Sequence, residues 1–569
     1  MAREFGAQRA RWWLLVAGLL LALAGGLLAQ SVRTAGGTTV TDVRFTGAGG
    51  QQMSALLYVP AGATPETKAP GILAVHGYIN SRETQDGFAI EFARRGYVVL
   101  ALDQTGHGYS DGPAFAHGFG GPDGLAYLRS LPMVDTDNIG LEGHSMGGWT
   151  VLAAAAAMPD AYKAMVLEGS STGAPFAQEG SPEWPRNLGL VFSTHDEFSA
   201  LMWGTPRALD VAQSTKLQAV FGTDEPVVAG RIYGDIAAGT ARRLYQPVTT
   251  HPGDHFSHAA IGDATDWFAR TLEGGKPRPA GDQTWRWKEI GTGLGLVGFV
   301  MVLLGAFDLL LRLQTFAALR AAPTAAREVR DGRWWRDFAL ATLVPALLFF
   351  PVFGAVYLLV PVSAVLPQQV TTQVAAWALL VAAIGLAIAR LTGSKLPDKR
   401  PDWLRAALLA IASVAAGYAV LWLADALFLT DFRLWVVAIK LPAAHHWASV
   451  AIYLLPLTLA MLAIMRTLAG LTVARDGPGK RMLAAVGALA GGMTAMLAAI
   501  YGIFFASGTL VTAFDPLSTV IAIQFVPVLA ALAVIGIFAW RRTGSYRPAG
   551  LMAGLLVTLY VVAGTATQA

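Results

Sequence analysis

The second half of the chain is dominated by apolar runs that are long enough to cross a lipid bilayer. The hydrocarbon core of a bilayer is about 30 Å thick, so a spanning helix needs about 20 mostly apolar residues. A buried helix of a soluble protein would be shorter, and a succession of such runs would not fit one soluble core. The sequence therefore predicts eight spanning helices in a transmembrane domain over 288–569, at about 290–311, 338–360, 373–391, 406–428, 447–465, 482–506, 520–540 and 549–566.

A ninth apolar run, from Trp12 to Leu28, follows three arginines near the N-terminus. Its length is close to the lower limit for a spanning helix, while Ala24 and Ala29 offer small residues for cleavage of a signal peptide. We expect a retained signal-anchor helix within residues 1–35 rather than a cleaved signal peptide. In both cases the segment that follows crosses the membrane.

Lysine and arginine residues gather in every second loop between these runs. With the N-terminus in the cytoplasm, the cytoplasmic segments hold 21 of the 42 Lys and Arg residues, whereas the short opposite loops hold only Arg433 and Lys440. Cytoplasmic loops of membrane proteins carry this excess of positive charge. We therefore predict a multi-pass protein of the cell membrane, with a cytoplasmic N-terminus and residues 36–287 on the extracytoplasmic side.

The composition agrees with this division of the chain. Charged residues make up 14% of the sequence, against about 25% in soluble domains, and the mean hydropathy is +0.47. These values exclude a purely soluble enzyme and a disordered protein, and the absence of cysteine excludes a disulfide scaffold. The net charge of +4 does not indicate a nucleic-acid partner, because half of the basic residues are explained by membrane topology.

Residues 36–287 have the pattern of a soluble α/β domain. Two runs around Gly49-Gly50 predict a β-hairpin, and further apolar strands alternate with helical stretches. Strands that alternate with helices indicate a doubly wound, mostly parallel sheet. The expected strands are 39–46, 53–60, 71–76, 97–103, 139–143 and 165–168, with helices at 84–95, 121–131 and 147–158.

The segment Gly143-His144-Ser145-Met146-Gly147 carries the main chemical signal. A sharp strand-to-helix turn presents the serine oxygen above the sheet, and crowding at that turn requires small residues on both sides. A chance match is conceivable in a chain with 62 glycines, but this one lies between an apolar strand and an alanine-rich helix. We predict Ser145 as a nucleophile, with the backbone N–H groups of Tyr78 and Met146 as the oxyanion hole.

A serine nucleophile needs a histidine base that comes last in the chain order. His251, His255 and His258 compete for this role, and His255 is predicted because it lies in a Gly-Asp-His-Phe loop before a helix. His251 and His258 are expected to shape the loop. The three could also bind a metal ion, although no clear set of carboxylate partners accompanies them, and no cofactor or metal is expected.

The acid of the triad is less narrowly defined by the sequence. The run Leu217 to Gly222 resembles the strand and loop that deliver it, with Glu225 three residues after the glycine and Asp224 one residue earlier. Glu168, at the end of the preceding strand, is a third candidate. The acid would fix the tautomer of His255 and stabilise its imidazolium.

Residues 39–273 resemble an α/β-hydrolase of the dienelactone hydrolase and prolyl-oligopeptidase-like branch. The resemblance rests on His76-Gly77-Tyr78, on Asp103-x-x-Gly106-x-Gly108-x-Ser110, on the serine motif, and on Gly222-Thr-Asp-Glu225 with Gly-Asp-His255. It covers under half of the chain and does not extend to 290–569. An insertion at about 172–215 departs from the pattern. It resembles a lid and holds Phe176, Trp184, Phe192, Phe198 and Trp203, which suit either an apolar acyl pocket or ordinary packing.

These features together predict a membrane-embedded serine hydrolase that cleaves esters of lipid-like or small acyl type. A peptidase, an amidase or an acyltransferase would use the same chemistry, and a transporter or sensor with a hydrolase-like binding domain is an alternative from another class. The expected partners are an acyl ester, lipid or peptide substrate and the bilayer. The eight C-terminal helices are expected to act as scaffold, in homo-oligomer formation or in substrate access, with Asp308 and Asp425 as the ionisable residues inside them.

Overall fold

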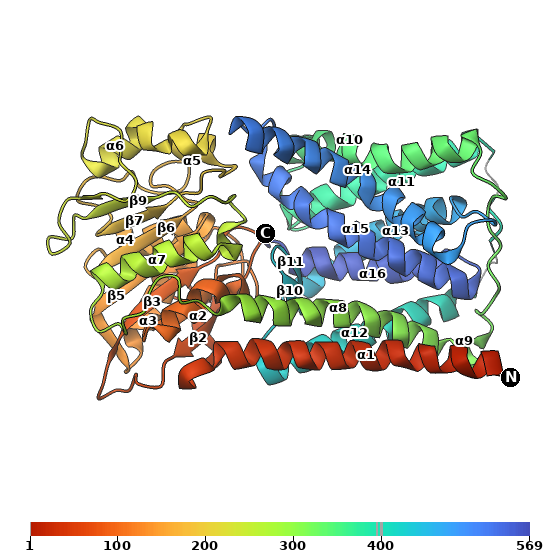
Figure 1. Cartoon of the computed structure of the whole chain (residues 1–569), viewed down its shortest axis with the longest axis horizontal. Helices are drawn as coiled ribbons and strands as arrows, with labels where there is room; N and C mark the ends of the chain where they lie inside the picture. The colour runs from red at the N-terminus through yellow and green to blue at the C-terminus, as the bar shows by residue number, and fades with distance from the viewer. Residues whose placement is uncertain (1, 394–395, 399–401) are drawn as a thin grey trace. The chain divides into compact units, whose positions relative to one another are not determined.

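The computed structural model describes residues 2–393, 396–398 and 402–569. Three of the basic residues assigned above to cytoplasmic loops, Lys395, Lys399 and Arg400, lie outside this range. The chain divides into two compact units (Figure 1). The sheet unit comprises Leu27–Ile290, Ile500–Pro516 and Thr565–Ala569, and the helical unit comprises Met1–Gly26, Gly291–Ala499 and Leu517–Gly564.

The sheet unit is built on a nine-stranded sheet of order β1-β2-β4-β3-β5-β6-β7-β9-β8. The strands from β4 to β9 in this order pair in parallel, whereas β1 and β2 form an antiparallel hairpin, β2 pairs antiparallel with β4, and β8 pairs antiparallel with β9. The predicted doubly wound, mostly parallel sheet is therefore confirmed. The strands are β1 (Thr39–Thr46), β2 (Gln52–Val59), β3 (Ala69–Val75), β4 (Val98–Asp103), β5 (Val134–His144), β6 (Ala164–Glu168), β7 (Leu188–Val191), β8 (Ile232–Tyr233) and β9 (Arg242–Tyr245).

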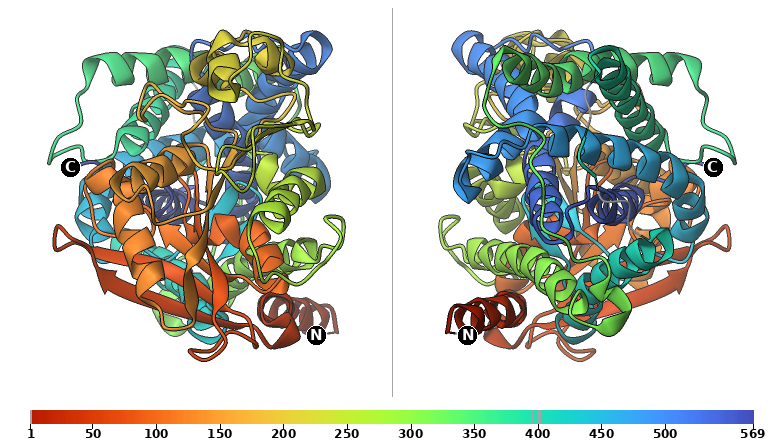
Figure 2. Two further views of the ribbon diagram at one scale, coloured as in Figure 1. Left: turned by 90° about the vertical axis from the view of Figure 1, so that its left-hand side faces the viewer. Right: turned by 90° about the vertical axis from the view of Figure 1, so that its right-hand side faces the viewer.

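Helices cover both faces of this sheet, which explains why strands β3 and β4 are mainly apolar. In the left view of Figure 2, the sheet separates α3 (Gly121–Ser130) and α4 (Met146–Ala157) from α7 (His258–Thr271). Helix α2 (Asp86–Arg94) packs with α7. A strand buried on both faces has no polar side, so β4 is buried at every position. The carboxyl ends of the parallel strands meet at one edge, where ligand chemistry is located in such folds.

Two segments differ from the sequence-based expectation. Residues 217–221 belong to helix α6 (Thr215–Phe221) and not to a strand. Strand β7 lies inside the segment 172–215 that was expected to be a lid, together with the short helix α5 (Ser199–Trp203). A fully buried run of four residues carries little periodicity, and its apolar character alone does not distinguish a strand from a helix.

The helical unit contains most of the long apolar helices of the chain. Eight helices of the described residues are long and apolar enough to cross a membrane, while α16 is apolar but has only 17 residues. Each of the nine predicted runs is therefore helical, and one falls short of this length. The helices are α1 (Ala2–Arg33), α8 (Trp285–Leu310), α10 (Gly332–Leu359), α11 (Gln369–Leu391), α12 (Trp403–Phe428), α13 (His446–Gly470), α14 (Pro478–Ser507), α15 (Pro516–Thr543) and α16 (Arg547–Ala563).

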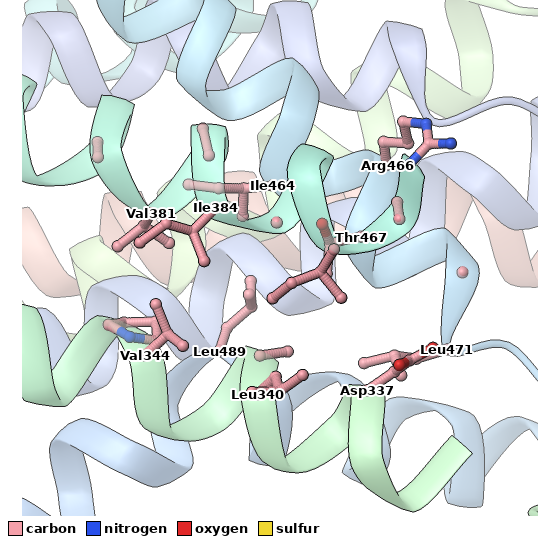
Figure 3. A pocket seen from close by; sticks show the side chains of 18 of the residues that line it. Asp337, Leu340, Val344, Val381, Ile384, Ile464, Arg466, Thr467, Leu471 and Leu489 are labelled. Atoms are coloured by element: carbon pink, nitrogen blue, oxygen red, sulfur yellow. The ribbon is translucent and has the colours of Figure 1, made fainter. Parts of the chain in front are cut away.

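Two features of the helical unit involve charged side chains. Asp308, predicted as an ionisable residue inside a span, is buried and forms an ion pair with Arg542. A cavity of about 110 Å³ lies among α10, α11 and α13 and is lined mainly by apolar side chains, with Asp337 and Arg466 as its charged residues (Figure 3). Asp337 is already paired with Arg327 and Arg336. The pairing of Asp308 with Arg542 is what burial of a charge requires.

Candidate active site

Ser145 occupies a sharp turn between β5 and α4. Its backbone has φ 56° and ψ −122°, a region that non-glycine residues rarely adopt. A Cβ placed on Gly143 would lie 2.2 Å from the carbonyl oxygen of Gly147, and one on Gly147 would lie 2.1 Å from that of Val75. The small residues of the motif are therefore a steric requirement of this turn, as expected for a nucleophile elbow.

The loop after β3 lies against the same turn. A Cβ on Gly77 would be 3.0 Å from Cβ of Ser145, so residues 76–78 pass beside the serine. His76 is buried, and its Nε2 accepts a hydrogen bond from the backbone N–H of Gln104 at 3.2 Å. The side chain of His76 thus shapes the loop that carries Tyr78.

A histidine–carboxylate pair lies at the carboxyl ends of β7 and β9. Asp196 follows β7, His251 follows β9, and Nδ1 of His251 is 2.8 Å from Oδ2 of Asp196. Both side chains are almost fully buried. The other carboxylate oxygen of Asp196 accepts a hydrogen bond from the backbone N–H of Phe198 at 2.7 Å. This arrangement holds the imidazole in one orientation, with Nδ1–H as the donor to the carboxyl group of Asp196.

The pair lies beside the serine turn. The backbone N–H of Ser145 donates to the carbonyl of Glu168 at 2.8 Å, and the next residue, Gly169, borders the pair. A Cβ on Gly169 would be 2.8 Å from Nδ1 of His251 and 3.0 Å from Oδ2 of Asp196. On the other side, Nε2 of His144 contacts the backbone carbonyl of His251 at 2.9 Å. His144, next to Ser145 in the chain, and Gly169, next to the residue that accepts the N–H of Ser145, thus both adjoin His251.

The electrostatic environment favours a charged His251. Burial lowers the pKa of His251, but the charge and hydrogen bond of Asp196 and the charges of Glu197 and Asp254 together raise it, and the net shift is upward. Burial lowers the pKa of His144, which keeps that ring neutral. Burial also raises the pKa of Asp254, 3.6 Å from His144, and raises the pKa of Glu197 to about 7. Stabilisation of an imidazolium by one ionised carboxylate is what a general base requires.

His255, the histidine favoured by the sequence, lies in a short 3₁₀ turn, Asp254–Phe256. Its ring is 4.1 Å from that of His144 and 5.9 Å from that of Phe88, measured between centroids. It is close to the serine turn, but the pair with the acid that follows β7 is made by His251. His258 is the first residue of α7 and is exposed.

The structure places the three carboxylates predicted for the triad in different surroundings. Asp224 and Glu225 are exposed and follow helix α6, so neither stands at the end of a sheet strand. The backbone N–H of Glu225 donates to Oγ1 of Thr223, which makes this segment a local turn. Glu168 is fully buried, and burial raises its pKa well above the usual range, which keeps it neutral. The three assignments stay predictions, and the carboxylate that the structure pairs with a histidine beside the serine turn is Asp196.

The sequence contains a signal for Asp196 that a strict glycine pattern misses. In the usual pattern the acid comes three residues after a glycine. Asp196 comes three residues after Ser193, so serine stands at the position where that pattern has glycine. The strand before it has only four residues.

Among the residues that the structure describes, no three His, Asp or Glu side chains are grouped to hold a metal ion.

Known proteins resemble the sheet unit over part of the chain. Residues 70–292 match the family model for the alpha/beta hydrolase fold. The chain is 32% identical over 148 residues to a monoacylglycerol lipase of Mycolicibacterium smegmatis. The matched region covers 24% of this chain and 49% of that protein. It is 30% identical over 99 residues to an uncharacterized protein of Mycobacterium tuberculosis, covering 17% of this chain and 28% of that protein. The chain therefore spans about half the length, or less, of these relatives.

Solved structures give similar but distant matches. An esterase of Pyrococcus furiosus is 18% identical, with 41% of this chain and 94% of that chain covered and a TM-score of 0.30. An epoxide hydrolase from an endophytic Streptomyces is 24% identical, with 24% and 38% covered and a TM-score of 0.20. The family-model match and the sheet topology agree on an alpha/beta hydrolase fold for residues 70–292, and they support a hydrolase.

Proposed function

We propose that this chain is a membrane-embedded serine hydrolase that cleaves esters with an apolar acyl group, using Ser145, His251 and Asp196. The observation that carries the proposal is the 2.8 Å contact between Nδ1 of His251 and Asp196 beside the strained turn at Ser145. The chain order Ser145, Asp196, His251 is the usual order of the triad in this fold. Each residue also follows a strand of the parallel sheet, since Ser145 follows β5, Asp196 follows β7 and His251 follows β9.

In the proposed mechanism, Oγ of Ser145 attacks the acyl carbon while Nε2 of His251 takes the hydroxyl proton. Nδ1–H of His251 donates to Asp196, which stabilises the imidazolium. The backbone N–H groups of Tyr78 and Met146 bind the oxyanion, and loss of one such donor typically costs about 10²–10³ in rate. His251 then protonates the leaving alcohol, and water releases the acyl group by the reverse sequence of steps.

An apolar acyl group is proposed because aromatic rings gather around the oxyanion loop and the first turn of α4. The ring centroids of Tyr78 and Phe115 are 5.9 Å apart, those of Phe115 and Phe176 are 6.2 Å apart, and those of Trp149 and Phe176 are 5.0 Å apart. Phe115 and Phe176 are 38% and 53% exposed. Exposed rings of this kind suit an apolar ligand, and the lipase similarity supports a lipid-like ester.

The membrane location is proposed from the apolar helices and from the distribution of basic residues. Eight helices of the described chain are long and apolar enough to span a bilayer. The excess of Lys and Arg in alternate loops favours a cytoplasmic N-terminus and an extracytoplasmic active site.

The proposal is tested by labelling the purified protein with a fluorescent fluorophosphonate, which reacts with activated serines. The wild type is expected to be labelled, Ser145→Ala to lose all labelling, and His251→Gln to be labelled far more slowly. His255→Gln is the matched control, since it changes the neighbouring histidine, whereas the 2.8 Å contact with Asp196 is made by His251. Unlabelled wild-type protein, or labelling lost in His255→Gln and kept in His251→Gln, would contradict the assignment.

A further inference from the structure

The last turns of α14 belong to the sheet unit and contact the loop that carries the proposed acid. Residues Ile500–Pro516 are part of this unit. Oη of Tyr501 donates a hydrogen bond to Oε1 of Glu197 at 2.6 Å. The other oxygen of the same carboxylate, Oε2, accepts a hydrogen bond from the backbone N–H of His251 at 2.8 Å. One buried carboxylate therefore joins α14 to the backbone of the proposed base.

We propose that Glu197 and Tyr501 are positioning residues that hold His251 in the orientation needed for general-base catalysis. The inference rests on the proposed function of His251. Asp196 holds the ring through Nδ1, while Glu197 holds the backbone of the same residue, so the two neighbouring carboxylates fix His251 at two points. Hydrogen bonds to a charged group are stronger than neutral ones, which suits them to this task.

Aromatic packing keeps α14 on this loop. The ring of His195 lies edge-on against Phe504 and Phe505, with centroids 5.7 Å and 5.3 Å away. The backbone N–H of His195 donates to the carbonyl of Thr249, two residues before His251, at 3.1 Å. The loop after β7 is thus held between α14 on one side and the His251 loop on the other. Displacement of Tyr501 would reach His251 through Glu197.

Glu197 also acts on His251 through its charge. The groups that face His251 are Asp196, Glu197, Asp254 and His144, and the negative charges of all three carboxylates raise its pKa. Glu197 faces Asp196, Tyr501 and His251, and the hydrogen bond from Tyr501 lowers the pKa of Glu197 against the effect of burial. Without the charge of Glu197, the imidazolium of His251 is less stable and loses its proton at a lower pH.

The experiment compares Tyr501→Phe, Glu197→Gln and Glu197→Ala with wild type in a p-nitrophenyl ester assay between pH 5 and 9. Tyr501→Phe is expected to lower kcat about tenfold with little change in KM, because a misplaced base slows the chemical step more than binding. Glu197→Ala is expected to lose more activity than Glu197→Gln, which keeps an oxygen acceptor. Tyr560→Phe is the matched control, since Oη of Tyr560 donates to Oε1 of Gln524 in the helical unit.

The pH profile separates this role from a merely structural one. In Glu197→Gln the acid limb of kcat/KM is expected to move to lower pH, and in Tyr501→Phe in the same direction by less. The position of this limb does not depend on the fraction of folded protein. If Tyr501→Phe and Glu197→Gln are active and keep both the wild-type kcat and the wild-type acid limb of kcat/KM, the positioning role is overturned and the proposed function is not. Wild-type protein with no Ser145-dependent activity would overturn the proposed function, and the positioning role with it.

Discussion

Ser145 has a positive φ that few side chains tolerate, and the residues around it are small because backbone atoms surround them. Gly143 and Gly147 each face a carbonyl oxygen at a distance that no Cβ could keep. His144, between Gly143 and Ser145, is a large residue whose ring packs on the rings of His251 and His255. The pentapeptide therefore supplies both the nucleophile and part of the support for the base.

Substitution of Gly147 tests the steric account of the turn. Gly147→Ala would place a Cβ 2.1 Å from the carbonyl oxygen of Val75, and the overpacking is expected to cost about 1–3 kcal/mol of stability. We expect a lower melting temperature in detergent and loss of fluorophosphonate labelling. Gly62→Ala is the control, because no atom lies within 4 Å of its Cβ. Wild-type labelling and stability in Gly147→Ala would contradict the account.

The charge on His251 leads to a prediction for the pH dependence of activity. Asp196 raises the pKa of His251 despite burial, so the neutral base forms only above the ordinary histidine value of about 6.5. We expect kcat/KM of the wild type to fall as the pH decreases through a value above 6.5. A fall centred well below 6.5, measured with an uncharged ester, would show that another group or another environment controls the base.

At the scale of elements, long and strongly patterned segments were predictable, and short ones were not. The hairpin β1–β2 and the apolar strands β3 and β4 follow directly from their patterns. Strand β7 has four residues and lies between irregular segments, so the sequence pattern places the acid after residues 217–221, which form helix α6. The pairing of β7 with β6 and β9 is a long-range contact that no local pattern specifies.

The aromatic group beside the site predicts a preference for longer acyl chains. Removal of the ring in Phe176→Ala is expected to lower kcat/KM for an octanoate ester about tenfold, because burial of an aromatic ring contributes about 1.5–3 kcal/mol. Hydrolysis of the acetate ester should change little. Phe45→Ala removes a ring that stacks on Tyr127 elsewhere in the sheet unit and serves as control. Equal losses on both esters in Phe176→Ala would exclude a role in acyl selection.

At the scale of the whole chain, the sequence predicted where the apolar helices lie but not where the compact units divide. The last turns of α14 and residues Thr565–Ala569 belong to the sheet unit, although both come after the long helical region in sequence. Gln568 donates to Oη of Tyr78 at 3.1 Å, and the backbone of Thr567 pairs with Gly106 and Ala114. Contacts between such distant positions depend on the folded chain and have no local signature.

The absence of cysteine makes the proposed topology directly testable. Glu66→Cys introduces a thiol at an exposed position of the sheet unit, and Gly477→Cys introduces one in the exposed loop between α13 and α14. A membrane-impermeant maleimide is expected to label the first variant and not the second in intact cells, and to label both after lysis. The reverse pattern in intact cells would place the hydrolase domain in the cytoplasm.

The central claim is that Asp196 and His251 form the charge pair that activates Ser145. The most direct measurement is kcat/KM for a p-nitrophenyl ester in Asp196→Asn, compared with the double variant Asp224→Asn, Glu225→Gln. We predict a loss of about 10⁴ in Asp196→Asn, because the asparagine holds the wrong tautomer of the base, and near wild-type activity in the double variant. Near wild-type activity in Asp196→Asn with a collapse in the double variant would contradict the account.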